Sequence, residues 1–194
     1  MRQLSLLLLV MALSLPAACT RPPAFKSSDI SGVDWGKDFA LTDPQGQRRR
    51  LADFKGKVVV LFFGFTQCPD VCPTTLSTLR EVMARLGDDA ARVQVVFVTL
   101  DPARDSDAVL AAYVTAFHPS FVGLSGDEAA IAAAAREFKV FYARQPGKVS
   151  GSYSIDHSTG SYVFDPQGRL RLLLRHGESA DNIAADLKLL LAGK

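Results

Sequence analysis

The sequence predicts a single α/β domain with a central mixed sheet flanked by helices and with one β-hairpin toward each end. Three observations indicate this class. An unbroken apolar run from Val58 to Phe65 is typical of a central strand that is covered on both faces. Strand-like and helical patterns alternate after that run, as parallel strands with crossover helices require. Two Asp-Pro-Gln-Gly segments, 43–46 and 165–168, lie between strand-like stretches and suit type I turns.

The first elements follow directly from these patterns. Residues 39–42 and 49–51 flank the first turn and predict the N-terminal hairpin. A helix is expected after the central strand, because Pro73 suits a first helical position, where its missing N–H is harmless. Gly87 ends the helical pattern. The residues expected to face the core recur every three or four positions: Leu76, Leu79, Met83 and Leu86.

The middle of the chain continues the alternation. Residues 92–100 predict a second buried strand, and residues 105–117 predict a helix opened by polar residues that suit an N-cap. A short strand is expected at 121–124, followed by an alanine-rich helix at 127–138. Its inward residues are predicted to be Ile131, Ala135 and Phe138.

The last third predicts a polar loop and then the C-terminal hairpin. The loop is expected at 144–152, and strands at 161–164 and 169–174 enclose the second turn. Ser179 is expected to cap a final helix whose buried stripe is Ile183, Leu187 and Leu190. A parallel strand-helix-strand core joined to an antiparallel hairpin and a closing helix is the order of thioredoxin-like folds. This fold class alone fixes no function.

Composition narrows the function classes. The chain has 194 residues, of which 48% are hydrophobic, and a formal net charge of +2. This length suffices for one domain with its own core. Because acidic and basic residues are interspersed, no nucleic-acid partner is expected.

The N-terminus is typical of an export signal. A basic start at Arg2, an apolar run from Leu4 to Leu15 and two alanines after Pro16 predict a signal peptide at residues 1–18. The apolar run is shorter than the ~20 residues that a membrane-spanning helix needs.

Cys19 follows two alanines, as in a bacterial lipoprotein cleavage site. We therefore expect a lipid anchor on Cys19, a tether over residues 19–34, and a folded domain over residues 35–194 on the periplasmic side of a membrane. That motif prefers an aliphatic residue where Pro16 stands, so ordinary cleavage near Ala18 and an uncleaved anchor remain alternatives.

The other two cysteines form a C-x3-C pair, Cys68 and Cys72, at the junction of the central strand and the first helix. Four residues of separation bring both sulfurs to one side of a helix. A helix N-terminus is expected to lower their pKa. Two soft thiolates favour Cu(I), and an added imidazole suits Cu(II) as well. Zinc is an alternative metal, although a structural zinc site needs a fourth protein ligand. A structural disulfide between the two cysteines is another alternative.

His157 is the candidate third ligand. It precedes the C-terminal hairpin, about where thioredoxin-like proteins carry a cis-proline beside their cysteines. His118 and His176 lie where a helix and a strand are expected to end, and neither is assigned a functional role.

Two aspartates are left open. Asp101 lies at the carboxyl end of a buried strand, where α/β proteins place their sites, and it either tunes the metal or only opens an Asp-Pro turn. Asp70, between the cysteines, is either solvated or faces a partner protein.

Three segments carry a family resemblance: residues 58–73 with Cys-Pro-Asp-Val-Cys-Pro, residues 98–105 with Asp-Pro-Ala-Arg-Asp, and residues 156–168 with Asp-His-Ser. Together they resemble the signatures of the Sco/SenC family, from about Phe39 to the C-terminus. The resemblance implies that Cys68, Cys72 and His157 bind one copper ion. It also implies delivery of copper to, or preparation of, the dinuclear copper site of cytochrome c oxidase subunit II. A periplasmic copper donor and a thioredoxin-like reductant are the further partners it suggests.

A metallochaperone is not the only function that this cysteine pair suits. The same cysteines, as a redox-active catalytic pair, suit a thiol-disulfide oxidoreductase that reduces the oxidase's copper-site cysteines, so enzymatic activity is left open. A copper or redox sensor is also left open. A peroxiredoxin is disfavoured, because its pattern has Pro and Thr seven and three residues before the reactive cysteine, and neither cysteine here has them.

Overall fold

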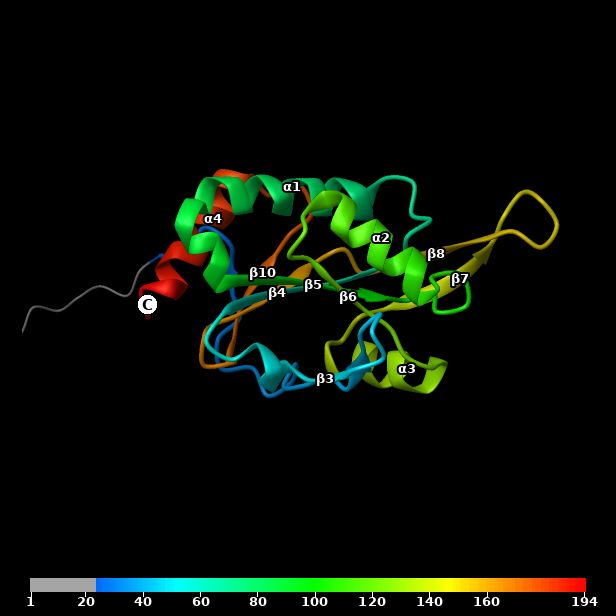
Figure 1. Cartoon of the computed structure of the whole chain (residues 1–194), viewed down its shortest axis with the longest axis horizontal. Coiled ribbons are helices and arrows are strands. Elements are labelled where there is room, and N and C mark those ends of the chain that lie inside the picture. Colours follow the sequence, from blue (N-terminus) through cyan, green and yellow to red (C-terminus); the bar gives the residue numbers. More distant parts are fainter. Residues whose placement is uncertain (1–23) are drawn as a thin grey trace, which may run out of the picture.

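The computed structural model describes residues 24–194, and the expected signal peptide and Cys19 lie outside these residues. The main sheet has six strands in the order β1-β10-β9-β4-β5-β6 (Figure 1). Their bounds are β1 Ser28–Asp29, β4 Val58–Gly64, β5 Val93–Thr99, β6 Val122–Leu124, β9 Ser161–Phe164 and β10 Leu170–Leu174.

The sheet is mixed, as predicted. The central strand β4 runs parallel to β5, with Val60 opposite Val95, and antiparallel to β9, with Val60 opposite Val163. Strand β6 extends the parallel half and β10 extends the antiparallel half. Every residue of β4 and β5 is buried, which explains why these strands lack polar alternation.

Helices cover both faces of the sheet. Figure 1 shows α1, α2 and α4 on one face, and α3 with the small hairpin β2–β3 on the other. Alternate residues of β4 divide between two apolar clusters: Phe62 packs with α1 and α4, and Phe63 packs with α3. The bounds are α1 Val71–Leu86, α2 Asp107–Phe117, α3 Glu128–Glu137, α4 Ala180–Leu191, β2 Leu41–Thr42 and β3 Arg48–Arg49. The thioredoxin-like arrangement is confirmed.

The predicted helix stripes are buried, but two helix starts were placed wrongly. Helix α1 begins at Val71, so Pro73 is its third residue, which is still a position whose N–H would have no partner in the helix. Helix α2 begins at Asp107 and is capped by Ser106, while Asp105 lies outside it. The Asp105 side chain is buried and accepts hydrogen bonds from Thr66, in the loop before the cysteines, instead of capping the helix.

The polar loop predicted at 144–152 is wrong in its extent. Strands β7 (Tyr142–Pro146) and β8 (Tyr153–His157) pair antiparallel and leave only a short tip between them. Figure 1 shows this hairpin extending from the body of the domain. It forms a separate two-stranded sheet.

The folded part also extends N-terminally of residue 35, the boundary expected from the sequence. Strand β1 pairs with β10. The backbone N–H groups of Lys26 and Ser27 donate to the carboxylate of Asp186, which is fully buried in α4. These bonds attach the end of the expected tether to the domain. Of the helices that the structure describes, none has the length and apolar character needed to cross a bilayer.

Candidate metal centre

Three side chains from two separate segments meet at one end of the sheet. Cys68 lies between β4 and α1, Cys72 lies in the first turn of α1, and His157 ends β8. One ligand atom from each residue lies within 4.8 Å of the other two. The structure therefore brings together the three residues that the sequence singled out as metal ligands.

Cys72 lies deep in the site. Its side chain is fully buried, and burial raises the pKa of its thiol, although a hydrogen bond from the Phe65 backbone acts in the opposite direction. The expectation that the helix N-terminus lowers the pKa of this thiol is therefore wrong, because desolvation outweighs it. Burial thus favours the protonated thiol, and a metal that binds Cys72 displaces this proton.

The close approach of Cys72 to the sheet depends on Gly64. A Cβ atom at this position would lie 2.7 Å from the Cys72 sulfur and 2.9 Å from Phe97 Cε2. Any other residue at the end of β4 would occupy the space that the sulfur fills. Gly64 is thus a steric requirement of the site.

The imidazole of His157 is oriented for metal binding. Its Nδ1 lies 2.8 Å from the carbonyl oxygen of Ser158, so Nδ1–H donates there and Nε2 keeps its lone pair. Nε2 lies 3.5 Å from the Cys72 sulfur. Burial lowers the pKa of His157, which favours the neutral, coordinating form. The ring meets Phe65 edge-on at 5.9 Å between centroids.

The donor set and its spacing fit a copper ion. Sulfur and imidazole ligands lie about 2.0–2.3 Å from a bound transition metal, so two of them are at most about 4.6 Å apart. Three ligands spread around one ion lie about 4 Å apart, so the observed cluster, within 4.8 Å, needs to contract by less than about 1 Å. Two thiolates and one imidazole suit both Cu(I) and Cu(II).

The two aspartates left open from the sequence are outside this cluster. Asp101 is fully buried, and its carboxylate is held by Arg104 and the hydroxyl of Tyr153. Asp70 is the exposed N-cap residue of α1 and accepts a hydrogen bond from Thr74. Neither carboxylate is among the grouped ligand atoms.

The other two histidines lie elsewhere, as expected. His118 follows α2, and its Nδ1 lies 2.8 Å from the hydroxyl of Ser120. His176 follows β10 and lies 3.4 Å from the hydroxyl of Thr75 on the exposed surface. Neither belongs to the cysteine cluster.

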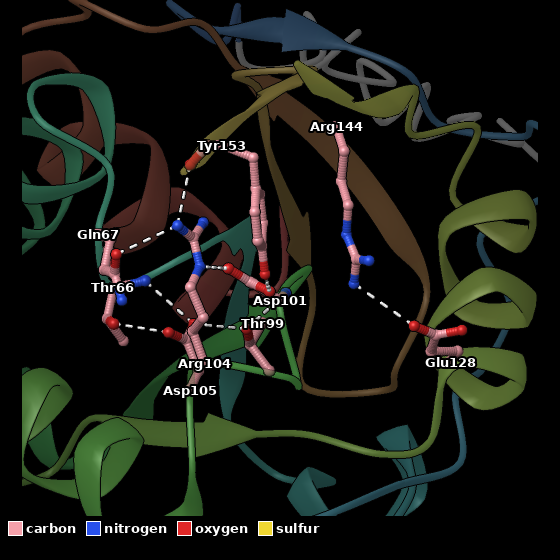
Figure 2. Close-up of polar contacts among 9 residues, drawn as sticks. All are labelled: Thr66, Gln67, Thr99, Asp101, Arg104, Asp105, Glu128, Arg144 and Tyr153. Atoms are coloured by element: carbon pink, nitrogen blue, oxygen red, sulfur yellow. Dashed lines mark hydrogen bonds and ion pairs between the residues drawn. The ribbon is translucent and has the colours of Figure 1, made fainter. Parts of the chain in front are cut away.

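A buried carboxylate supports the loop that precedes the cysteines. Asp105 accepts bonds from the backbone N–H and the hydroxyl of Thr66, at 3.0 and 2.6 Å, and from the hydroxyl of Thr99 at 2.6 Å (Figure 2). These bonds fix the loop between β4 and α1 against the end of β5.

Sequence reasoning missed the hairpin that carries His157. The signal was present, because Tyr153, Ile155 and His157 alternate with polar Ser154 and Asp156, which is the period of a half-buried strand. The structure confirms this pattern, with Ile155 buried in the core.

Comparison with known proteins points to one protein family. Residues 28–192 match the family model described as SCO1/SenC. The chain is 40% identical over 153 residues to the mitochondrial SCO2 homolog of Mus musculus, covering 78% of this chain and 60% of that protein. It therefore spans about three fifths of that relative's length.

Solved structures show the same fold. The copper-bound structure of ScoI from Bradyrhizobium japonicum is 39% identical with a TM-score of 0.73, covering 79% of this chain and 98% of that one. The apo Sco1 solution structure from Thermus thermophilus is 45% identical with a TM-score of 0.78, covering 87% and 98%.

Proposed function

This chain belongs to the SCO1/SenC family, and on that premise we propose that it is a copper metallochaperone for cytochrome c oxidase assembly. It binds one copper ion through Cys68, Cys72 and His157. It then delivers copper to, or prepares, the dinuclear site of oxidase subunit II. The observation that carries the proposal is the meeting of two sulfurs and one available imidazole nitrogen within 4.8 Å. The copper-bound structure of the similar Bradyrhizobium ScoI supports it.

Exposure of the ligands gives the direction of transfer. Cys68 is partly exposed, whereas Cys72 is buried beneath it. An incoming thiolate of the target protein therefore reaches the metal from the Cys68 side. Exchange of this ligand first, followed by Cys72 and His157, passes the ion on without releasing it to water.

We expect the reduced domain to bind one equivalent of Cu(I) or Cu(II). His157→Ala is expected to lower the affinity for Cu(II) far more than the affinity for Cu(I). Cu(I) is held well by two thiolates, but Cu(II) favours a nitrogen ligand. Anaerobic titration, followed by the sulfur-to-copper charge-transfer absorption, measures both affinities. His118→Ala is the matched control and leaves them unchanged. If the reduced wild type lacks tight copper binding, the proposal is wrong.

A second function is favoured by the pairing of the cysteines. The partly exposed Cys68 sulfur attacks a disulfide of the target and forms a mixed disulfide while one target thiol leaves. Cys72 then attacks Cys68, the second target thiol leaves, and two electrons have passed to the target. This reductase activity needs no imidazole ligand. His157→Ala therefore retains it while losing Cu(II), which separates the two functions in one variant.

We further propose a periplasmic, membrane-anchored location with residues 1–18 removed, Cys19 lipidated and a short tether leading to the domain. The support is the sequence of the first nineteen residues. The expected result is a membrane-bound mature protein that Cys19→Ala converts to a form extracted by aqueous buffer. Mass spectrometry of the mature N-terminus checks the lipid directly, and an unmodified Cys19 contradicts the proposal.

A further inference from the structure

The hairpin that carries His157 is not part of the main sheet. Among the strands that the structure describes, β7 and β8 pair only with each other, whereas the cysteines follow β4, the central strand. The distance between His157 and the cysteines is therefore set by tertiary contacts between the hairpin and the cysteine loop.

One guanidinium contacts both segments. Arg104 Nη1 donates to the side-chain oxygen of Gln67 at 3.2 Å and to the backbone oxygen of Tyr153 at 2.9 Å. Gln67 immediately precedes Cys68, and Tyr153 is the first residue of β8. Figure 2 shows Arg104 between these two segments.

Arg104 is itself held rigidly. Its Nε donates to the fully buried carboxylate of Asp101, whose other oxygen accepts the hydroxyl of Tyr153 at 2.7 Å. The guanidinium lies over the Tyr153 ring, 3.7 Å from its centroid, and 5.9 Å from that of Phe65. A planar, forked cation is suited to this combination of stacking and divergent hydrogen bonds.

We propose that Arg104 is a positioning residue that joins the cysteine loop to the His157 hairpin and thereby sets the geometry of the copper site. This inference rests on the proposed function. Arg104 does not touch the ligand atoms, and it acts through Gln67 on Cys68 and through β8 on His157. Arg104 is expected to affect mainly the affinity for Cu(II), because Cu(II) depends on the imidazole ligand more than Cu(I) does.

Three variants test this role. Arg104→Lys keeps a cation beside Asp101 but cannot reach both Gln67 and Tyr153. Gln67→Ala removes only the contact with the cysteine loop and guards against misfolding of the first variant. Arg144→Gln is the matched control, because Arg144 lies 5.1 Å from the other side of the same tyrosine ring and pairs with the exposed Glu128.

We expect Arg104→Lys to weaken Cu(II) binding roughly 10–100-fold, in the range found when residues supporting metal ligands are changed. Both Arg104→Lys and Gln67→Ala are expected to shift the sulfur-to-copper charge-transfer band, Gln67→Ala to a smaller degree. Arg144→Gln is expected to match the wild type in affinity and in spectrum. In a His157→Ala background, Arg104→Lys weakens Cu(II) binding by a clearly smaller factor, because only its contact with the cysteine loop is left to lose. A purely structural role predicts additive losses instead.

The outcomes separate the two proposals. If wild type binds copper, but Arg104→Lys and Gln67→Ala match Arg144→Gln in affinity and spectrum, the positioning role is wrong and the metallochaperone stands. Additive losses in the double variant also overturn the positioning role. If wild type itself does not bind copper, the proposed function is wrong.

Discussion

Cys72→Ser abolishes tight copper binding while the domain remains folded: this is the largest effect on affinity that we expect. A serine hydroxyl is a hard, weakly acidic donor and a poor ligand for Cu(I). The Cys72 sulfur also lies beside the imidazole, 3.5 Å from His157 Nε2. We expect Cu(I) affinity to fall at least about 1000-fold, which corresponds to about 4 kcal/mol.

Competition with a chromophoric Cu(I) chelator under anaerobic conditions measures this loss. Thermal unfolding of the metal-free proteins provides the control, because serine is close to cysteine in size and can bond to His157 in the buried site. Cys68→Ser, at the exposed side of the pair, is expected to lose copper as well. Binding by Cys72→Ser within tenfold of wild type would rule out Cys72 as a ligand.

The parts of the fold that the sequence predicted are those set by local patterns. The apolar run of β4, the repeats on α1 and α4, and the turns at 43–46 and 165–168 each depend on neighbouring residues. In both turns the glycine N–H donates to the aspartate carbonyl, at 2.9 Å for Gly46 and 2.8 Å for Gly168. Such features can be predicted from each segment of the sequence separately.

The parts that were missed depend on distant residues. The alternation in β8 is short, and the polar composition of its partner β7 concealed the hairpin. Arg104 lies in a motif noted for its resemblance, yet its contacts with Gln67 and Tyr153 span 37 and 49 residues. The attachment of Ser27 to Asp186 spans 159 residues. No local pattern predicts which side chains meet at such separations.

The candidate ligands were predicted for a different reason. Cysteine and histidine are uncommon here, and their chemistry limits what a close pair and a third donor can do. The raised pKa of the Cys72 thiol was not predictable, because it depends on how deeply this residue is buried. Residue identity thus indicates which side chains are the ligands, whereas packing determines the pKa of the buried thiol before copper binds.

Gly64→Ala is expected to have the largest effect on stability, because Gly64 packs directly against the buried Cys72. The added methyl group would lie 2.7 Å from the Cys72 sulfur, 2.9 Å from Phe97 Cε2 and 3.2 Å from Phe62 Cε1. Both phenylalanines are fully buried and have little room to move. Overpacking of this kind costs about 1–3 kcal/mol of the free energy of unfolding. Part of the strain is relieved by moving the sulfur, so copper affinity falls too.

Gly123→Ala in β6 separates the two consequences. Its methyl group would lie 2.5 Å from Leu110 Cγ, in the same sheet but against α2 rather than the cysteines. We expect both variants to unfold at lower denaturant concentration, and only Gly64→Ala to bind copper more weakly and with an altered charge-transfer band. If both variants lose copper affinity equally, the effect comes from general destabilisation. If Gly64→Ala binds like the wild type, the sulfur does not need the space beside Gly64. Loss confined to Gly64→Ala means that the absence of a side chain at the end of β4 is what lets a buried thiol reach the metal.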